Sequence, residues 1–192
     1  GGAICLDKGL SQITVGLGWD MIRGRAELDL DASIAGLTAN SKLLQNEWFV
    51  FYNNLKSPNG SIVHQGDARG GGGGNTDDES IDIDLTQVPQ QIVKILVIVS
   101  IHNAGNRSFA ELQNAYLRLV DKTNGRETHH LNLNEFGNNQ CMVLAEINRN
   151  QRGQWEINPV CLGVPSLDIL VNNIQLDQLN KVAVSPKKKH YL

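Results

Sequence analysis

Hydrophobic and polar residues alternate along most of the chain with the period of two that is typical of β-strands. In Ala26–Ile34, hydrophobic residues occupy the even positions, while aspartate and serine occupy positions 29, 31 and 33. The same alternation recurs in Ser80–Leu85. Further runs of this kind predict strands at Gln12–Gly18, Glu47–Tyr52, Gln113–Val120, Thr128–Leu133, Gln140–Asn148 and Gln154–Cys161. Each strand is expected to turn one face to a core and the other to solvent.

One segment is hydrophobic on both faces. Ile92–Ile101 is rich in isoleucine and valine, which is typical of a central strand covered on each side. Turn-forming residues separate the predicted strands, at Ser57–Gly60, Asn124-Gly125, Gly137–Asn139 and Arg152-Gly153. About nine short strands with such spacing predict an all-β fold, a two-sheet β-sandwich.

Helical periodicity appears in two places. Ser108–Leu112 is a short stretch between two predicted strands. Near the end of the chain, Ser166 can cap a helix whose hydrophobic residues follow at Leu167, Leu170, Val171 and Ile174. This spacing predicts a short C-terminal helix from about Leu167 to Leu179. We therefore expect a sandwich domain over residues 1–164, followed by a helix and a basic, solvated tail over residues 165–192.

Composition and charge narrow the class of protein. The chain has 192 residues, 41% of them hydrophobic and 19% charged, which suits a folded domain with a substantial core. Its net charge of −3 argues against a nucleic-acid-binding protein. The longest hydrophobic run, Ile92–Ile101, is about half of the roughly 20 residues that a transmembrane helix needs. Three cysteines without C-x-x-C spacing favour a reducing compartment, and no secretory signal is visible, so we expect a cytoplasmic protein.

The feature richest in candidate chemistry is an acidic, glycine-rich segment, Gly66–Glu79. It contains five consecutive glycines, Gly70–Gly74, and ends in Asp77-Asp78-Glu79 at the head of a predicted strand. Adjacent like charges repel unless they spread into solvent or share a cation. Calcium suits such a segment, because it takes roughly six to eight oxygen ligands in irregular geometry. The alternative is a solvated acidic loop that binds no ion.

A second pair of carboxylates extends the candidate set. Asp29 and Asp31 lie two residues apart on a predicted strand and therefore project to the same side. Carboxylates that could bind Ca²⁺ are thus Asp29, Asp31, Asp67, Asp77, Asp78 and Glu79.

Other chemistries find less support. The glycine run lacks the Gly-Lys-Ser/Thr ending of a phosphate-binding loop, and the histidines and cysteines have no local zinc-ligand spacing. Neither Gly-x-Ser-x-Gly nor another nucleophile motif occurs, and calcium is a poor Lewis acid, so we expect no enzyme activity. His102 is expected to be structural, and Trp19, Trp48 and Trp155 to belong to the core.

Several short motifs in a fixed order carry a family resemblance. They are Gly16–Asp20, Leu28–Ser33, Phe49–Asn54, Ser57–Ser61, His64-x-Gly66-Asp67, Asp77–Glu79, and Val93–Ile95 leading into Ile101-His102. Together they resemble the tellurium-resistance TerD family of bacterial stress proteins, from about Asp7 to about Gly163.

The resemblance implies a calcium-binding β-sandwich that acts in tellurite and general stress resistance and has no established catalytic activity. The family's acidic positions fall on the same six carboxylates. Two departures stand out: Ala68 replaces an asparagine of the family loop, and Pro165–Leu192 lacks the family's Gly-Tyr-Gly-Gly-rich ending. If the family fold holds two calcium ions, we expect one of them to be weakened here.

The resulting functional hypothesis is structural. Calcium orders Gly66–Glu79 and so forms a surface that other proteins of a stress-response complex recognise. One alternative is a calcium-dependent module for a small ligand, a sugar or a nucleotide, with Tyr52 and Trp48 as the candidate aromatic residues. Another is a metal-free assembly scaffold.

Overall fold

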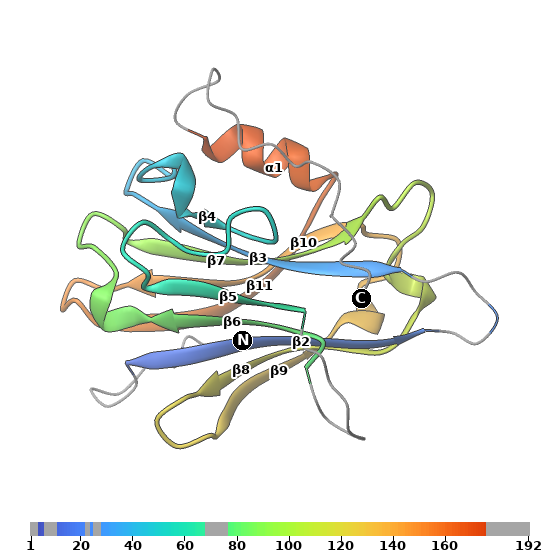
Figure 1. Cartoon of the computed structure of the whole chain (residues 1–192), viewed down its shortest axis with the longest axis horizontal. Helices are drawn as coiled ribbons and strands as arrows, with labels where there is room; N and C mark the ends of the chain where they lie inside the picture. Colours follow the sequence, from blue (N-terminus) through green and yellow to red (C-terminus); the bar gives the residue numbers. More distant parts are fainter. Residues whose placement is uncertain (1–3, 6–10, 22–23, 25–27, 68–76, 176–192) are drawn as a thin grey trace.

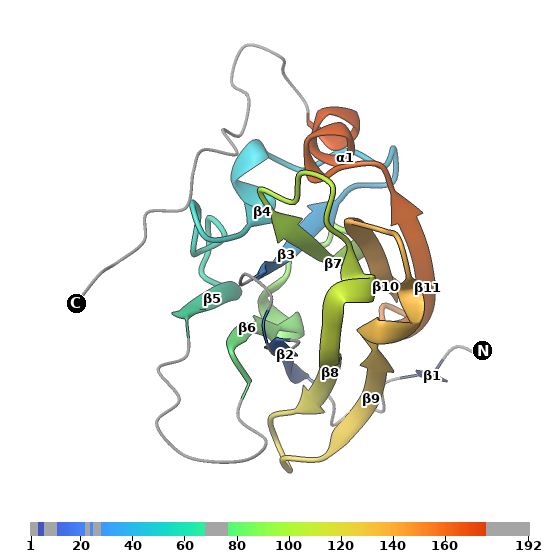
Figure 2. The same cartoon turned by 90° about the vertical axis from the view of Figure 1, so that its right-hand side faces the viewer.

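The computed structural model describes residues 4–5, 11–21, 24, 28–67 and 77–175. They form two antiparallel sheets packed face to face, with one short helix on the outside (Figures 1 and 2). This confirms the predicted all-β, two-sheet fold. The six-stranded sheet has the order β1-β11-β10-β7-β3-β4, and the five-stranded sheet has the order β5-β6-β2-β8-β9.

The six-stranded sheet draws its strands from the whole length of the chain. They are β1 (Ile4–Cys5), β3 (Asp29–Leu37), β4 (Phe49–Val50), β7 (Lys94–His102), β10 (Cys141–Arg149) and β11 (Trp155–Val164). β7 lies between β3 and β10, and all its residues except the two end ones are buried. The prediction of a central strand here is confirmed, since side chains on both faces of β7 are covered.

The five-stranded sheet carries most of the polar residues discussed below. Its strands are β5 (Ile62–Asp67), β6 (Glu79–Asp84), β2 (Gln12–Met21), β8 (Leu112–Asp121) and β9 (Glu127–Asn132). Inward-facing residues such as Ile13, Val15 and Leu17 of β2 are fully buried and alternate with outward-facing ones. β5 was not predicted as a strand, and its pairing with β6 is what holds it in the sheet.

The helix α1 (Leu167–Ile174) covers part of the outer face of the six-stranded sheet (Figure 1). It begins where predicted, because the Ser166 hydroxyl accepts a hydrogen bond from the Ile169 amide at 3.2 Å. It ends at Ile174, earlier than the predicted Leu179. Val171 and Ile174 are buried in the same core as the sheets, and the Leu43 amide donates to the Ile174 carbonyl at 2.8 Å. This part of the C-terminal region therefore packs onto the sandwich.

The described part of the chain also contains four short 3-10 helices: η1 (Asn46–Trp48), η2 (Leu85–Gln87), η3 (Phe109–Glu111) and η4 (Leu133–Phe136). One of them corrects an expectation from the sequence, and another confirms one. Trp48 was predicted in a strand but belongs to η1, while the helical pattern at Ser108–Leu112 is η3, closed by a capping box between Ser108 and Glu111.

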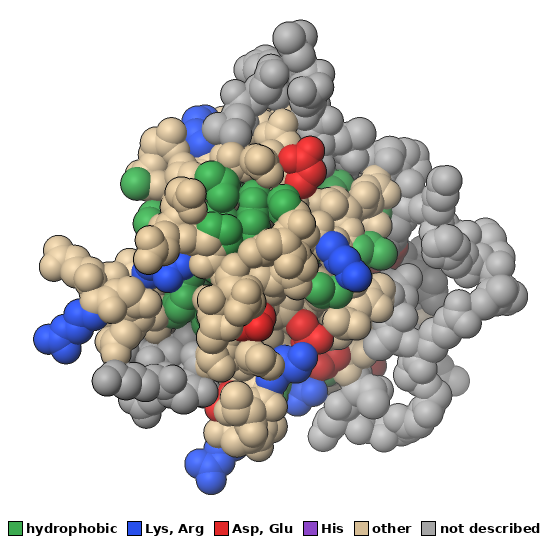
Figure 3. All heavy atoms as spheres, turned by 60° about the vertical axis from the view of Figure 1, so that its left-hand side comes forward, with side chains coloured by type: hydrophobic (Ala, Val, Ile, Leu, Met, Phe, Trp, Pro, Cys, Tyr) green, Lys and Arg blue, Asp and Glu red, His purple; other side chains and the backbone are tan. Residues whose placement is uncertain are grey.

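The outer face of the six-stranded sheet is covered where it carries polar residues of β3. Asp31 and Ser33 are 1% and 0% exposed, so the face of β3 that alternation assigns to solvent is an interior face. Elsewhere the surface is mixed: acidic, basic, hydrophobic and neutral side chains lie together on the face drawn in Figure 3.

Candidate functional site

The carboxylate of Glu79 joins the two sheets. Glu79 opens β6, is 1% exposed, and lies opposite Asp67 of β5 in the strand register. Its Oε1 accepts two hydrogen bonds, from the Ala32 amide at 3.0 Å and from His64 Nε2 at 2.6 Å. Ala32 belongs to β3 in the other sheet, two residues before the pair that β3 makes with β4. Glu79 thus satisfies a backbone donor that lies beyond the end of β4.

The hydrogen bonds of His64 define the charge of this group. The Gly66 amide donates to His64 Nδ1 at 2.9 Å, so Nδ1 carries no proton, and the proton on Nε2 is the one donated to Glu79. His64 is therefore neutral and does not balance the charge of Glu79. Within the described ranges, Glu79 Oε2 is buried and has no hydrogen-bond partner. Burying a charged carboxylate whose second oxygen has no partner costs free energy, unless a cation binds that oxygen.

Asp77 has a different environment from Glu79. Arg118 donates to both of its oxygens, from Nε to Oδ1 at 2.9 Å and from Nη2 to Oδ2 at 3.0 Å. The Tyr116 hydroxyl donates to Oδ1 at 2.9 Å. A Cβ at Gly16 would lie 2.3 Å from Asp77 Oδ2, so only glycine at this position lets the carboxylate lie across β2. The ion pair with Arg118 satisfies the charge of Asp77 on the outer face of the sheet.

Electrostatics around Asp77 agree with this pairing. Burial and the hydrogen bond to Asp77 raise the pKa of Tyr116 to about 12, and the hydrogen bond to Asp77 raises the pKa of Arg118. Tyr116 is therefore a neutral donor and Arg118 a cation throughout the physiological range.

Asp78 is exposed and lies between these two groups in sequence. Its amide donates to the Leu17 carbonyl at 2.8 Å, and its Oδ2 accepts from the Trp19 amide at 2.9 Å. Asp67 lies at the end of β5, opposite Glu79, but its side chain is outside the described part of the chain, as are residues 68–76.

Asp29 and Asp31 occupy another region. They lie on β3 opposite His102 and Ser100 of β7, and Asp31 Oδ2 is 3.7 Å from His102 Nδ1. Asp31 lines a cavity of about 280 Å³ that also includes Asp168, in the first turn of α1. The structure therefore does not bring these two carboxylates together with Asp77. Over the residues it describes, no three His, Cys, Asp or Glu side chains lie close enough to hold a metal ion.

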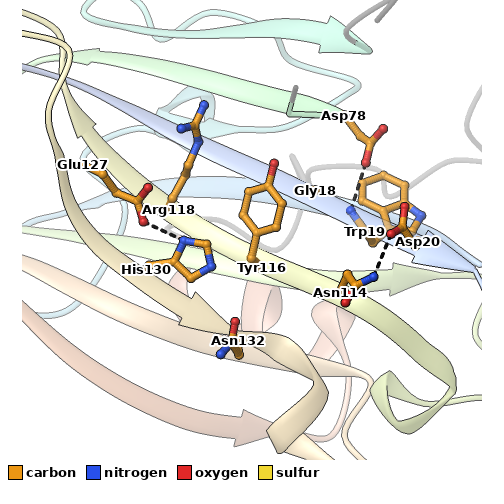
Figure 4. A pocket seen from close by; sticks show the side chains of 10 residues that line it. All are labelled: Gly18, Trp19, Asp20, Asp78, Asn114, Tyr116, Arg118, Glu127, His130 and Asn132. Atoms are coloured by element: carbon orange, nitrogen blue, oxygen red, sulfur yellow. Dashed lines mark hydrogen bonds and ion pairs between the residues drawn. The ribbon is translucent and has the colours of Figure 1, made fainter. Parts of the chain in front are cut away.

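A second feature, the cleft on the outer face of the five-stranded sheet, lies beside Asp78 (Figure 4). It has a volume of about 730 Å³. It is lined by Gly18, Trp19, Asp20, Asp78, Asn114, Tyr116, Arg118, Glu127, His130 and Asn132. The aromatic residues named from the sequence do not line it: Trp48 is 2% exposed in the core, and Tyr52 packs edge-on against His102. Trp19, assigned to the core from the sequence, is only partly buried and lines the cleft.

Sequence reasoning assigned no site role to His64, which it noted only as part of a family motif, and it missed Tyr116 and Arg118. The available signal was the pair Gly16 and Gly18 inside a predicted strand, because glycines there often mark a place where another group approaches the backbone closely. The side chain that approaches each glycine depends on the order of the strands, which the sequence pattern does not give.

Comparison with known proteins places this architecture in a family. The model of the TerD domain matches residues 1–173. The chain belongs to the TerD family. The tellurium resistance protein TerD of an Alcaligenes species is 40% identical over 170 residues, covering 85% of this chain and 88% of that protein. General stress protein 16U of Bacillus subtilis is 37% identical over 162 residues, covering 82% and 83%.

A solved structure supports the fold of this TerD-family protein. The crystal structure of a homologue of the telluride resistance protein TerD from Streptomyces coelicolor matches with a TM-score of 0.70 at 24% identity, covering 84% of this chain and 95% of that one. The family groups tellurium-resistance proteins with stress-response proteins. Across the described residues, no helix is long and apolar enough to cross a membrane.

Proposed function

We propose that this TerD-family protein binds Ca²⁺ beside Glu79, and that the ion orders Gly66–Glu79 into a surface recognised by other proteins of a stress-response complex. In this proposal the protein acts in the cytoplasm, without catalysis, in resistance to tellurite and related stress. The names of the relatives support the cellular role.

The observation that carries the calcium proposal is the buried, uncompensated charge of Glu79. Its Oε1 is satisfied by Ala32 and by the neutral His64, while Oε2 has no hydrogen-bond partner in the part of the chain described. A hard cation that prefers oxygen ligands would bind Oε2 and balance the charge of the carboxylate. Asp67 lies opposite Glu79 in the strand register and Asp78 precedes Glu79 in the chain, so both remain candidates for further carboxylate ligands.

The other predicted ligands have separate roles in the proposal. Asp77 is already neutralised by Arg118, so we expect it to support the site by holding the segment before β6 to β8. Asp29 and Asp31 would serve a second ion, because Asp31 lines a different cavity and Asp29 lies two residues before it on β3.

Calorimetric titration tests the proposal. Calcium is added to the full chain after treatment with a chelator, and magnesium serves as the control cation. We expect saturable calcium binding, and a stabilisation of about 2.7 kcal/mol when free calcium is about 100 times its Kd. Glu79→Gln should abolish this binding, because it removes the charge and keeps the shape of the side chain.

Asp82→Asn is the matched control. Asp82 lies on the same strand but on the outer face, where it accepts from Thr14 Oγ1 at 2.6 Å. Calcium affinity that is equal in Glu79→Gln and in the unmodified chain would refute the site. Absence of heat and of any rise in melting temperature at millimolar calcium would favour a metal-free scaffold.

A growth assay tests the cellular role. Expression of the chain in a tellurite-sensitive bacterium that lacks its own TerD protein should raise the tolerated tellurite concentration, and Glu79→Gln should not. Equal protection by both chains would separate stress resistance from calcium.

A further inference from the structure

The cleft on the outer face of the five-stranded sheet has an aromatic floor. Tyr116 lies opposite Gly18 in the strand register, and a Cβ at Gly18 would come within 2.5 Å of the tyrosine ring. The absence of a side chain at Gly18 therefore lets the ring lie across β2. His130 of the neighbouring strand β9 stacks with Tyr116, with ring centroids 5.2 Å apart and planes 22° apart.

Figure 4 shows these rings and that of Trp19 in the same cleft, with polar side chains around them. The ring of Tyr116 is held in place, because its hydroxyl donates to Asp77. A rigid aromatic surface of this kind can stack on a flat, weakly polar face of a ligand at low entropic cost.

The charge of the side chains that line the cleft disfavours anionic ligands. Among the described residues, Arg118 is the only Lys or Arg that lines the cleft, and its guanidinium is paired to both oxygens of Asp77. The carboxylates of Asp20 and Asp78 remain, together with Glu127, which pairs with His130 at 2.6 Å. The described lining of the cleft is thus negative, which disfavours phosphates, nucleotides and other anions.

The arrangement of polar groups favours another class. The carboxylates are spread around the rim, and each is held by a donor of the protein, as Asp20 Oδ2 is held by Asn114 Nδ2 at 3.0 Å. They do not converge on a point, as a metal ion would require; the described residues contain no such cluster. Amide groups of Asn114 and Asn132 lie among them. Spaced acceptors and amides match a ligand that carries several hydroxyl groups.

We propose that this cleft binds a neutral saccharide, whose apolar ring face stacks on Tyr116 and Trp19 while its hydroxyls donate to Asp20 and Glu127. The inference does not rest on calcium: the floor and most of the rim belong to β2, β8 and β9, away from Glu79.

Tryptophan fluorescence of the full chain tests the proposal. Trp48 and Trp155 are buried, whereas Trp19 lines the cleft, so a ligand there should change the emission of Trp19. The probes are glucose, galactose, mannose, N-acetylglucosamine, maltose and cellobiose, each added with calcium and again with a chelator. We expect at least one of them to bind saturably, with a Kd in the millimolar range or below, under both conditions.

Two substitutions of Tyr116 distinguish the contribution of its ring to binding from that of its hydroxyl. Tyr116→Phe keeps the stacking surface and should change the Kd less than about threefold, while Tyr116→Ala should weaken binding at least tenfold. Asp20→Asn on the rim should also weaken it, and this variant leaves the floor intact. Lys122→Ala is the control, because Lys122 lies on the same sheet face outside the cleft.

The outcomes that overturn the proposal are distinct. One is the absence of saturable binding by any of the six sugars up to about 50 mM. Another is binding that Tyr116→Ala and Asp20→Asn both leave unchanged. Preference for adenosine monophosphate would contradict the charge argument, and binding of spermidine alone would make the cleft a cation site. Loss of calcium binding in Glu79→Gln with sugar binding retained would leave this inference standing.

Discussion

Gly16→Ala tests the interpretation that a missing side chain in β2 makes room for the ion pair of Asp77. A Cβ at Gly16 would lie 2.3, 2.5 and 2.7 Å from Oδ2, Cγ and Oδ1 of Asp77, which is too close for any real contact. The backbone at Gly16 does not have a positive φ, so alanine itself fits the strand. The whole cost should therefore come from displacing Asp77.

The magnitude follows from what Asp77 would lose. Displacement breaks the bidentate pair with Arg118 and the hydrogen bond from Tyr116. Charge-assisted hydrogen bonds contribute about 1.5–3 kcal/mol each when buried. The side chains of Arg118 and Asp77 are 29% and 12% exposed, so solvent reduces these values. We expect Gly16→Ala to lower the free energy of unfolding by about 2 kcal/mol.

Urea unfolding of a double-mutant cycle is the assay. In an Asp77→Ala background, the clash is absent, and Gly16→Ala should be neutral or stabilise by about 0.5 kcal/mol, because alanine loses less backbone entropy than glycine on folding. Equal slopes against urea would show that the unfolded states are comparable. If Gly16→Ala lowered the unfolding free energy equally in both backgrounds, the proposed role of Gly16 would be wrong.

Three further predictions follow from single residues. Tyr116 should ionise near pH 12 by absorbance, and in Asp77→Asn its pKa should fall but stay above the ordinary value, because burial is the larger cause of the shift. Because its folded pKa is the higher one, the stability it contributes is complete below about pH 10 and is lost as pH rises through 12. Burial raises the pKa of Cys141 to about 12, so in a chain with Cys5 and Cys161 replaced by serine its thiol should react with a disulfide reagent only on unfolding. Ser166→Ala should lower the unfolding free energy by about 1 kcal/mol in urea, because it removes the N-cap of α1.

The local pattern of hydrophobic and polar residues predicted most of the strands. Alternation located the core-facing residues of β2 and β6, and the doubly hydrophobic run located β7 as a central strand. It missed β5, whose place depends on pairing with β6. It also put Trp48 into a strand, because a buried 3-10 turn and a buried strand show the same short run of hydrophobic residues.

The candidate site was less predictable, because its geometry depends on distant segments. Asp77, Asp78 and Glu79 are consecutive, yet Asp77 pairs with Arg118, Asp78 with the Trp19 amide, and Glu79 with His64 and the Ala32 amide. A run of acids in sequence indicates a concentration of charge, but only Glu79 belongs to β6, where it is buried, whereas Asp77 and Asp78 precede the strand and lie on the outer side of the sheet. Each carboxylate therefore meets different partners.

By itself, the sequence determined what depends on residues a few positions apart: the two-residue period of most strands, the turns between them, and the Ser166 cap of α1. Tertiary structure decided which faces are covered. Asp31 is buried because segments outside β3 close over it, and Tyr116 lies across Gly18 because β8 is the neighbour of β2. Strand order brings together residues such as Arg118 and Asp77, 41 positions apart, and no local pattern of hydrophobic and polar residues encodes that order.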